Sequence, residues 1–146
     1  MSYRGARNAL VALFVGSLVA QICAVIVTYS KEVIADRDLV NILLKLLAVY
    51  GVHLTIMIGG IVARQQDEKG KPQSKKAPAT AFRVAIALAA LWNLLLVWRS
   101  VKFGMGAFDE NSEDNVDLLT DYIDKIAAGG SFLVAGFLSF FFAKRE

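Results

Sequence analysis

An uncharged run from Ala9 to Tyr29 is the feature that most constrains this chain, because it is 21 residues long. A helix of that length, at 1.5 Å per residue, matches the roughly 30 Å thickness of the hydrocarbon core of a bilayer. Arg4 and Arg7 precede the run, as basic residues do in a secretory signal peptide, but the run is longer than the apolar region of such a signal and no clear cleavage site follows it. The run therefore predicts a transmembrane helix.

Three more apolar stretches follow and bring the apolar content to 56%. The second of these is short in its strict form, since Val84 to Trp98 lies between two arginines, but long arginine side chains can place their guanidinium groups at the interface. We expect spans over 9–29, 39–63, 79–103 and 120–143. The sequence thus predicts an all-α membrane protein whose single domain, residues 1–146, is an antiparallel bundle of four transmembrane helices.

The distribution of basic residues predicts the orientation of these spans. Ten of the 16 Lys and Arg residues lie in the two termini and the middle connection, whereas ten of the 13 Asp and Glu residues lie on the opposite side. Short loops rich in Lys and Arg stay in the cytoplasm. We therefore expect a multi-pass protein of the cell membrane, the inner membrane in a bacterium, with both termini cytoplasmic.

The cytoplasmic connection, residues 65–80, contains both prolines of the chain and no large apolar side chain, which predicts a flexible loop. Its lysines can hold anionic lipid headgroups or can form an ordinary solvated loop, and both interpretations stay open. No nucleic-acid-binding motif accompanies the basic residues, so nucleic acid is not expected as a partner. The lysines concerned are Lys69, Lys71, Lys75 and Lys76.

The outer connection, residues 104–117, is acidic instead. Three of its residues match the first ligand positions of an EF-hand loop, but Asp114 and Thr120 occupy the positions that require glycine and glutamate, so no calcium site is expected. From Val116 onward, apolar residues recur every three or four positions. The fourth helix is therefore expected to begin outside the membrane and to extend beyond the bilayer on the outer side.

Small residues spaced four apart occur in every span, and such stripes allow transmembrane helices to approach closely. We expect them at contacts between helices, with one stripe left to pack against another subunit. The phenylalanines near the end of the fourth span cannot all point inward, so several should face lipid or a partner. The main packing candidates are Gly16, Ala20, Gly51, Gly59, Ser131 and Ala135; the third span contributes Ala81, Ala85 and Ala89.

Four charged residues lie toward the outer ends of the spans: Lys45, Arg99, Asp121 and Asp124. Charged groups in a membrane are costly and are candidates for function. Arg99 and Asp124 can pair across the hairpin of the third and fourth spans. Two interpretations stay open, a structural ion pair or an outer vestibule that selects ions by charge.

Gln21, His53 and Asn93 lie nearer the middle of their spans, where polar side chains need hydrogen-bond partners. They can find one another. His53 can act as a proton relay, since histidine titrates near neutral pH, or as a hydrogen-bonded packing residue.

The sequence contains no nucleophile beside a base, no glycine-rich phosphate loop and no metal-ligand spacing, and it has only one Cys and one His. We therefore expect no catalytic residues, no metal, no cofactor and no enzymatic activity. Two classes of function remain. One is a membrane subunit that anchors, scaffolds or senses through a protein partner in a homo- or hetero-oligomer. The other is an oligomeric ion channel or a regulated pore-forming effector.

Overall fold

The computed structural model describes residues 3–31, 34–67, 79–105 and 112–143, which form four helices. These are α1 (Tyr3–Tyr29), α2 (Asp36–Asp67), α3 (Ala79–Gly104) and α4 (Ser112–Ala143). Each contains a segment long and apolar enough to cross a membrane: Arg4–Tyr29, Asp36–Val62, Ala79–Gly104 and Val116–Phe142. The prediction of a helical chain with four such helices is confirmed.

The helices extend past the expected spans because polar turns continue the helical hydrogen bonding at their ends. α2 begins at Asp36, and the carboxylates of Asp36 and Asp38 in its first turn favour the positive end of the helix dipole. α4 has 32 residues and is therefore about 48 Å long at 1.5 Å per residue. That length exceeds the roughly 30 Å hydrocarbon core, so α4 is long enough to project beyond a bilayer.

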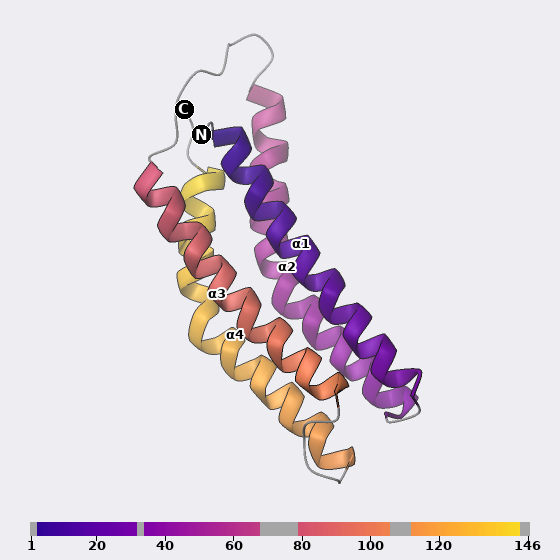
Figure 1. Cartoon of the computed structure of the whole chain (residues 1–146). Helices are drawn as coiled ribbons and strands as arrows, with labels where there is room; N and C mark the ends of the chain where they lie inside the picture. Colours follow the sequence, from indigo (N-terminus) through magenta and orange to yellow (C-terminus); the bar gives the residue numbers. More distant parts are fainter. Residues whose placement is uncertain (1–2, 32–33, 68–78, 106–111, 144–146) are drawn as a thin grey trace.

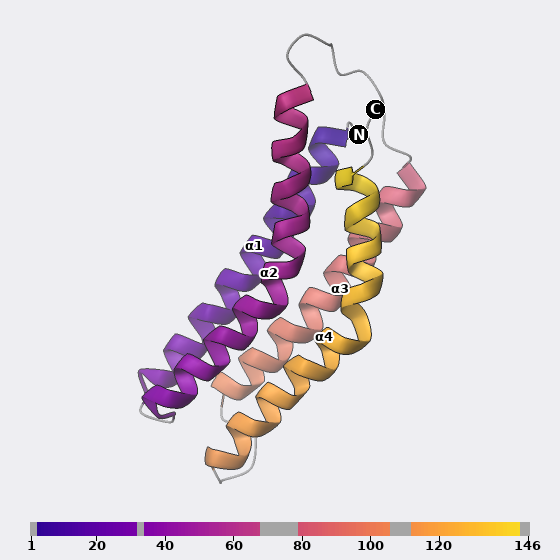
Figure 2. The ribbon, with the colours of Figure 1, turned by 180° about the vertical axis from the view of Figure 1, so that it is seen from behind.

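The four helices pack side by side in the order α1, α2, α4, α3 around a common axis (Figures 1 and 2). α1 and α4 each contact both α2 and α3, whereas α2 and α3 lie on opposite sides of the interior. The start of α1 and the end of α4 lie at the same end of the molecule (Figure 1). There the buried Arg7 donates a hydrogen bond from Nε to the carbonyl oxygen of Phe141, at 2.9 Å.

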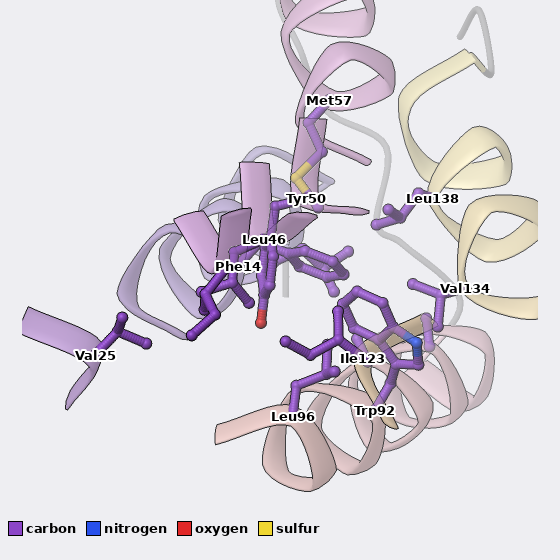
Figure 3. Close-up of a cluster of buried hydrophobic side chains, with 14 of the residues drawn as sticks. Phe14, Val25, Leu46, Tyr50, Met57, Trp92, Leu96, Ile123, Val134 and Leu138 are labelled. Atoms are coloured by element: carbon purple, nitrogen blue, oxygen red, sulfur yellow. The ribbon is translucent and has the colours of Figure 1, made fainter. Parts of the chain in front are cut away.

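Large side chains fill the interior (Figure 3). On α1 and α2 they recur every three or four residues, which places them on one face of each helix. α3 contributes small residues as well as large ones, since Ala85 and Ala89 are buried beside Trp92 and Leu96. The fully buried large side chains on α1, α2 and α4 include Leu10, Phe14, Ile42, Leu46, Tyr50, Met57, Leu119, Ile123, Leu138 and Phe141.

The predicted small-residue stripes of α1 and α2 do not lie in this interior. Gly16, Ala20 and Gly59 are exposed and Gly51 is half-buried. A Cβ atom added to any of the three glycines would meet no atom within 4 Å. The prediction that these residues pack against other helices of the same chain is therefore wrong. The reason is helical geometry. Gly16 follows the buried Phe14 by two residues, a rotation of about 200° around the helix axis, so it lies on the opposite face of α1.

Ser131 and Ala135 on α4 are half-buried, and the α3 stripe does point inward at Ala85 and Ala89. Among the phenylalanines of α4, Phe141 and Phe142 are buried, whereas Phe132 and Phe140 are exposed.

Two other glycines allow the closest approaches between helices. A Cβ atom at Gly60 of α2 would lie 2.6 Å from the Cβ atom and the carbonyl oxygen of Phe142 on α4. At Gly130 of α4 it would lie 2.6 Å from Cδ1 of the Trp92 indole on α3. A side chain at Gly60 must displace the backbone of α4, and one at Gly130 must displace the Trp92 ring.

Candidate functional site

A polar cluster in the interior joins α1, α2 and α3 through the hydroxyl of Tyr50. Gln21 donates a hydrogen bond from Nε2 to this oxygen, at 2.5 Å, and the Tyr50 hydroxyl donates to Oδ1 of Asn93, at 2.8 Å. Ser100 approaches from α3, with its Oγ 3.4 Å from Oε1 of Gln21. All four residues are buried. Since an unsatisfied polar group in an apolar interior is costly, this cluster fixes the relative positions of the three helices.

The sequence indicates Gln21 and Asn93 but not the residue that connects them. Tyr50 counts as apolar in a hydropathy pattern because its ring is large. The hydroxyl of Tyr50 could have indicated this role, because a buried tyrosine hydroxyl needs a polar partner. The helices before and after α2 in the sequence each carry an amide side chain at a similar depth.

His53 lies outside this cluster. Its Nδ1 is 2.9 Å from the carbonyl oxygen of Val49, one turn earlier in α2. A carbonyl can only accept, so Nδ1 carries the proton in this contact. Nε2 is buried and has no hydrogen-bond partner within the described part of the chain.

Aromatic rings surround the His53 imidazole. The ring of Phe14 stacks on it with centroids 5.4 Å apart, and the Trp92 ring lies 4.8 Å away at a steeper angle. Phe14 and Trp92 also contact each other and the ring of Tyr50. These four residues from α1, α2 and α3 close the middle of the interior, and His53 is fully buried among them.

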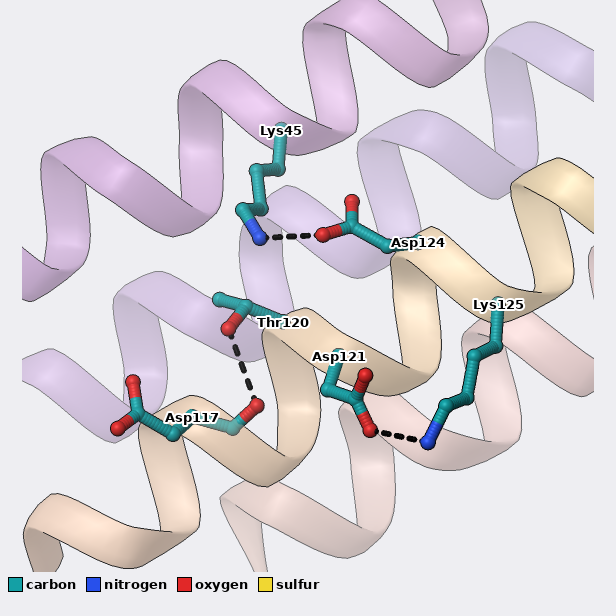
Figure 4. Close-up of polar contacts among 6 residues, drawn as sticks. All are labelled: Lys45, Asp117, Thr120, Asp121, Asp124 and Lys125. Carbon is teal, nitrogen blue, oxygen red and sulfur yellow. Dashed lines mark hydrogen bonds and ion pairs between the residues drawn. The ribbon is translucent and has the colours of Figure 1, made fainter.

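The four outer charges do not form one group, and Figure 4 shows the ion pairs of three of them. Lys45 of α2 lies 2.6 Å from Oδ2 of Asp124 on α4, and Asp121 binds Lys125 of its own helix at the same distance. The predicted pair of Arg99 with Asp124 is wrong. The guanidinium of Arg99 lies instead over the ring of Tyr122, 4.8 Å from its centroid. The physical reason is that α4 packs against α2 as well as α3, which brings a lysine to Asp124 from a helix that is not its neighbour in sequence.

These ion pairs are mainly positioning contacts. The side chains of Lys45 and Asp124 are 31% and 56% exposed, and ion pairs at such exposure contribute about 0 to 1 kcal/mol each. Lys45 and Asp121 each lie beside one residue of opposite charge.

Within the described ranges, no group of three or more His, Cys, Asp or Glu side chains could hold a metal ion. The lysines at 69, 71, 75 and 76, and residues 106–111 of the acidic connection, lie outside the described residues.

Comparison with known proteins gives no further identity. No family model, no curated protein and no solved structure matches this chain. The class of this protein therefore rests on the structure alone. It is a helical protein with four helices long and apolar enough to cross a membrane.

Proposed function

We propose that this protein is a non-enzymatic subunit of the cell membrane that anchors or scaffolds a protein partner in a homo- or hetero-oligomer. Its four helices cross the bilayer as an antiparallel bundle with both termini in the cytoplasm. The partner binds from within the membrane, against the outward faces of α1 and α2.

The observation that carries this proposal is the position of Gly16, Gly51 and Gly59. Space beside all three is open, since a Cβ atom at any of them would meet no atom of another helix within 4 Å in the part of the chain that the structure describes. Glycine inside a helix costs about 1 kcal/mol relative to alanine, and here no contact within the chain offsets that cost. In membranes, glycines on a helix surface let the backbone of another helix approach closely. A partner helix therefore accounts for glycines that the bundle itself does not need.

The filled interior supports a scaffold over a pore within one chain. Phe14, Tyr50 and His53 are fully buried, and Trp92 is almost so. Their rings lie in contact at the middle of the bundle, where a conducting path would have to pass. The alternative is a pore enclosed by several copies, and the same purified protein distinguishes the two functions.

Leucine substitutions at the open glycines test the proposal. Gly16→Leu and Gly59→Leu add bulk at exposed positions, and at the half-buried Gly51 a Cβ atom meets no other helix within 4 Å, so the bundle itself should keep its helix content and melting temperature. We expect each to reduce the mass of the purified complex measured by light scattering in detergent. Gly129→Leu is a matched control, because Gly129 is equally open but lies on α4.

An unchanged mass in all three variants contradicts the proposal, as does wild-type protein that is a single chain with no co-purified polypeptide. Single-channel recording from the same preparation tests the pore. A scaffold carries no current, whereas reproducible unitary currents that are lost with the oligomer overturn the scaffold function.

A further inference from the structure

An apolar furrow of about 260 Å³ runs along the outside of the molecule between α3 and α4. Leu88, Leu91 and Leu95 of α3 form one wall, and Leu133 of α4 contributes to the other. Trp92 lies at its base and is only 4% exposed. This surface is separate from the outward faces of α1 and α2, so a ligand in the furrow is independent of the proposed protein partner.

Adjacent glycines on α4 create the furrow. Gly130 leaves room for the Trp92 indole, whose Nε1 donates to the carbonyl oxygen of Ile126 at 3.3 Å. This contact fixes the ring beneath α4. A Cβ atom at Gly129, on the outer side, would meet nothing within 4 Å. Glycine therefore leaves the furrow open at a point where any other side chain would project into it.

The length of the furrow suits one hydrocarbon chain of one leaflet. On α4 it extends from Lys125 to Val134, which is ten residues or about 13.5 Å for nine steps of 1.5 Å. Half of the roughly 30 Å hydrocarbon core is about 15 Å. An acyl chain that enters at Lys125 therefore reaches the inner end of the furrow near the middle of the bilayer.

Charged groups of both signs stand at the outer end. Lys125 donates to Oδ2 of Asp121 at 2.6 Å, and their side chains are 74% and 55% exposed, so both can also reach a ligand. One turn farther out on α3, Trp98 is 56% exposed, with Nζ of Lys102 5.3 Å from its ring centroid. An exposed tryptophan beside a lysine is typical of the headgroup level of a membrane.

We propose that the furrow binds one phosphatidylethanolamine molecule of the outer leaflet. One acyl chain lies against Trp92 and Gly129, the phosphate binds Lys125, and the primary ammonium binds Asp121. A headgroup that carries a phosphate but no cation would be repelled by the acidic start of α4, where Asp117, Asp121 and Asp124 are exposed. A quaternary ammonium has no N–H to donate to the Asp121 carboxylate. The pair of opposite charges therefore selects a headgroup with a phosphate and a primary ammonium.

Fluorescence of Trp92 tests this binding directly. The chain has two tryptophans, so Trp98→Phe leaves Trp92 as the only one. Delipidated protein in detergent is titrated with phosphatidylethanolamine, phosphatidylcholine or phosphatidylglycerol, each with bromine on its acyl chains as a quencher. We expect saturable quenching at one phosphatidylethanolamine per chain, with half-saturation about tenfold higher for the other two lipids. Equal half-saturation for all three, or quenching that never saturates, overturns the proposal.

Three variants locate the site. Gly129→Leu fills the furrow without a clash at its Cβ atom and should abolish the saturable quenching at unchanged helix content. Gly136→Leu is the matched control, since it is equally open on α4 but lies seven residues farther along, and it should bind as the parent does. Asp121→Asn should remove the preference for phosphatidylethanolamine over phosphatidylglycerol. Retained binding in Gly129→Leu, or a retained preference in Asp121→Asn, contradicts the assignment.

Discussion

Nζ of Lys45 on α2 lies 2.6 Å from Oδ2 of Asp124 on α4, which makes these two residues an ion pair between helices that are not neighbours in sequence. Because α3 lies between them in the chain but not in space, this contact reports directly on the order of the helices around the bundle.

The Lys45–Asp124 ion pair should give a measurable interaction free energy in a double-mutant cycle. We expect Lys45→Ala and Asp124→Ala each to lower the free energy of unfolding in detergent by about 0.5 to 1 kcal/mol, and the double variant to lose less than their sum. Arg99→Ala combined with Asp124→Ala is the control and should be additive. Coupling of Asp124 to Arg99 instead of Lys45 would show a different helix order.

Removal of the Tyr50 hydroxyl should destabilise the bundle by more than the loss of one hydrogen bond, because this oxygen binds both Gln21 and Asn93. Tyr50→Phe leaves Nε2 of Gln21 and Oδ1 of Asn93 without this partner in a buried site, at a cost of about 1 to 3 kcal/mol. Tyr29→Phe removes an exposed hydrogen bond to Asp36 and serves as the control, with an expected change below about 1 kcal/mol. Equal melting temperatures for the two variants would mean that the interior cluster does not hold the helices in place.

The role of His53 can be separated into ring packing and hydrogen bonding. His53→Phe keeps an aromatic ring between Phe14 and Trp92 and loses only the contact with the Val49 carbonyl, so stability should change by about 1 kcal/mol or less. His53→Ala should cost about 3 to 5 kcal/mol because it leaves a cavity among the rings. Thermal unfolding in detergent measures both. A large loss in His53→Phe would assign the buried Nε2 a role that packing does not explain.

Gly59 and Gly60 are adjacent but should respond oppositely to alanine. The new methyl group of Gly60→Ala would lie 2.6 Å from Phe142, which should cost about 1 to 3 kcal/mol of stability. The methyl group of Gly59→Ala would meet no other described helix within 4 Å, so this variant should leave the bundle unchanged or more stable by up to about 1 kcal/mol. The melting temperatures of the two variants decide this. Similar losses in both would place Gly59 in a contact inside the chain.

The four helices could be predicted from sequence because the hydrocarbon core sets a requirement that each segment meets alone, about 20 apolar residues. The inward face of each helix could not. In a soluble protein the polar residues mark the outer face, but here lipid and interior are both apolar, so Phe14 and Gly16 fit either environment by composition. The small-residue rule then selects the stripes on α1 and α2 that face outward.

The candidate site could be predicted in part for a related reason. Gln21, His53 and Asn93 stand out in the sequence because amide and imidazole groups are costly in any apolar surrounding. Their partners depend on which helices meet, and that information is not local. The contacts of Tyr50 and the pairing of Lys45 with Asp124 both result from the order α1, α2, α4, α3, which no single segment specifies.

Crosslinking from the outward glycines in native membranes tests the central claim most directly. Cys23→Ser removes the only cysteine, and Gly16→Cys, Gly51→Cys or Gly59→Cys then carries a photoactivatable maleimide on the outer face. Leu94→Cys, on the exposed side of α3, is the control. A scaffold subunit should give a discrete protein adduct larger than the 15.9 kDa chain from the glycine positions and none from position 94. Lipid adducts of the single chain at all three glycine positions would contradict the account.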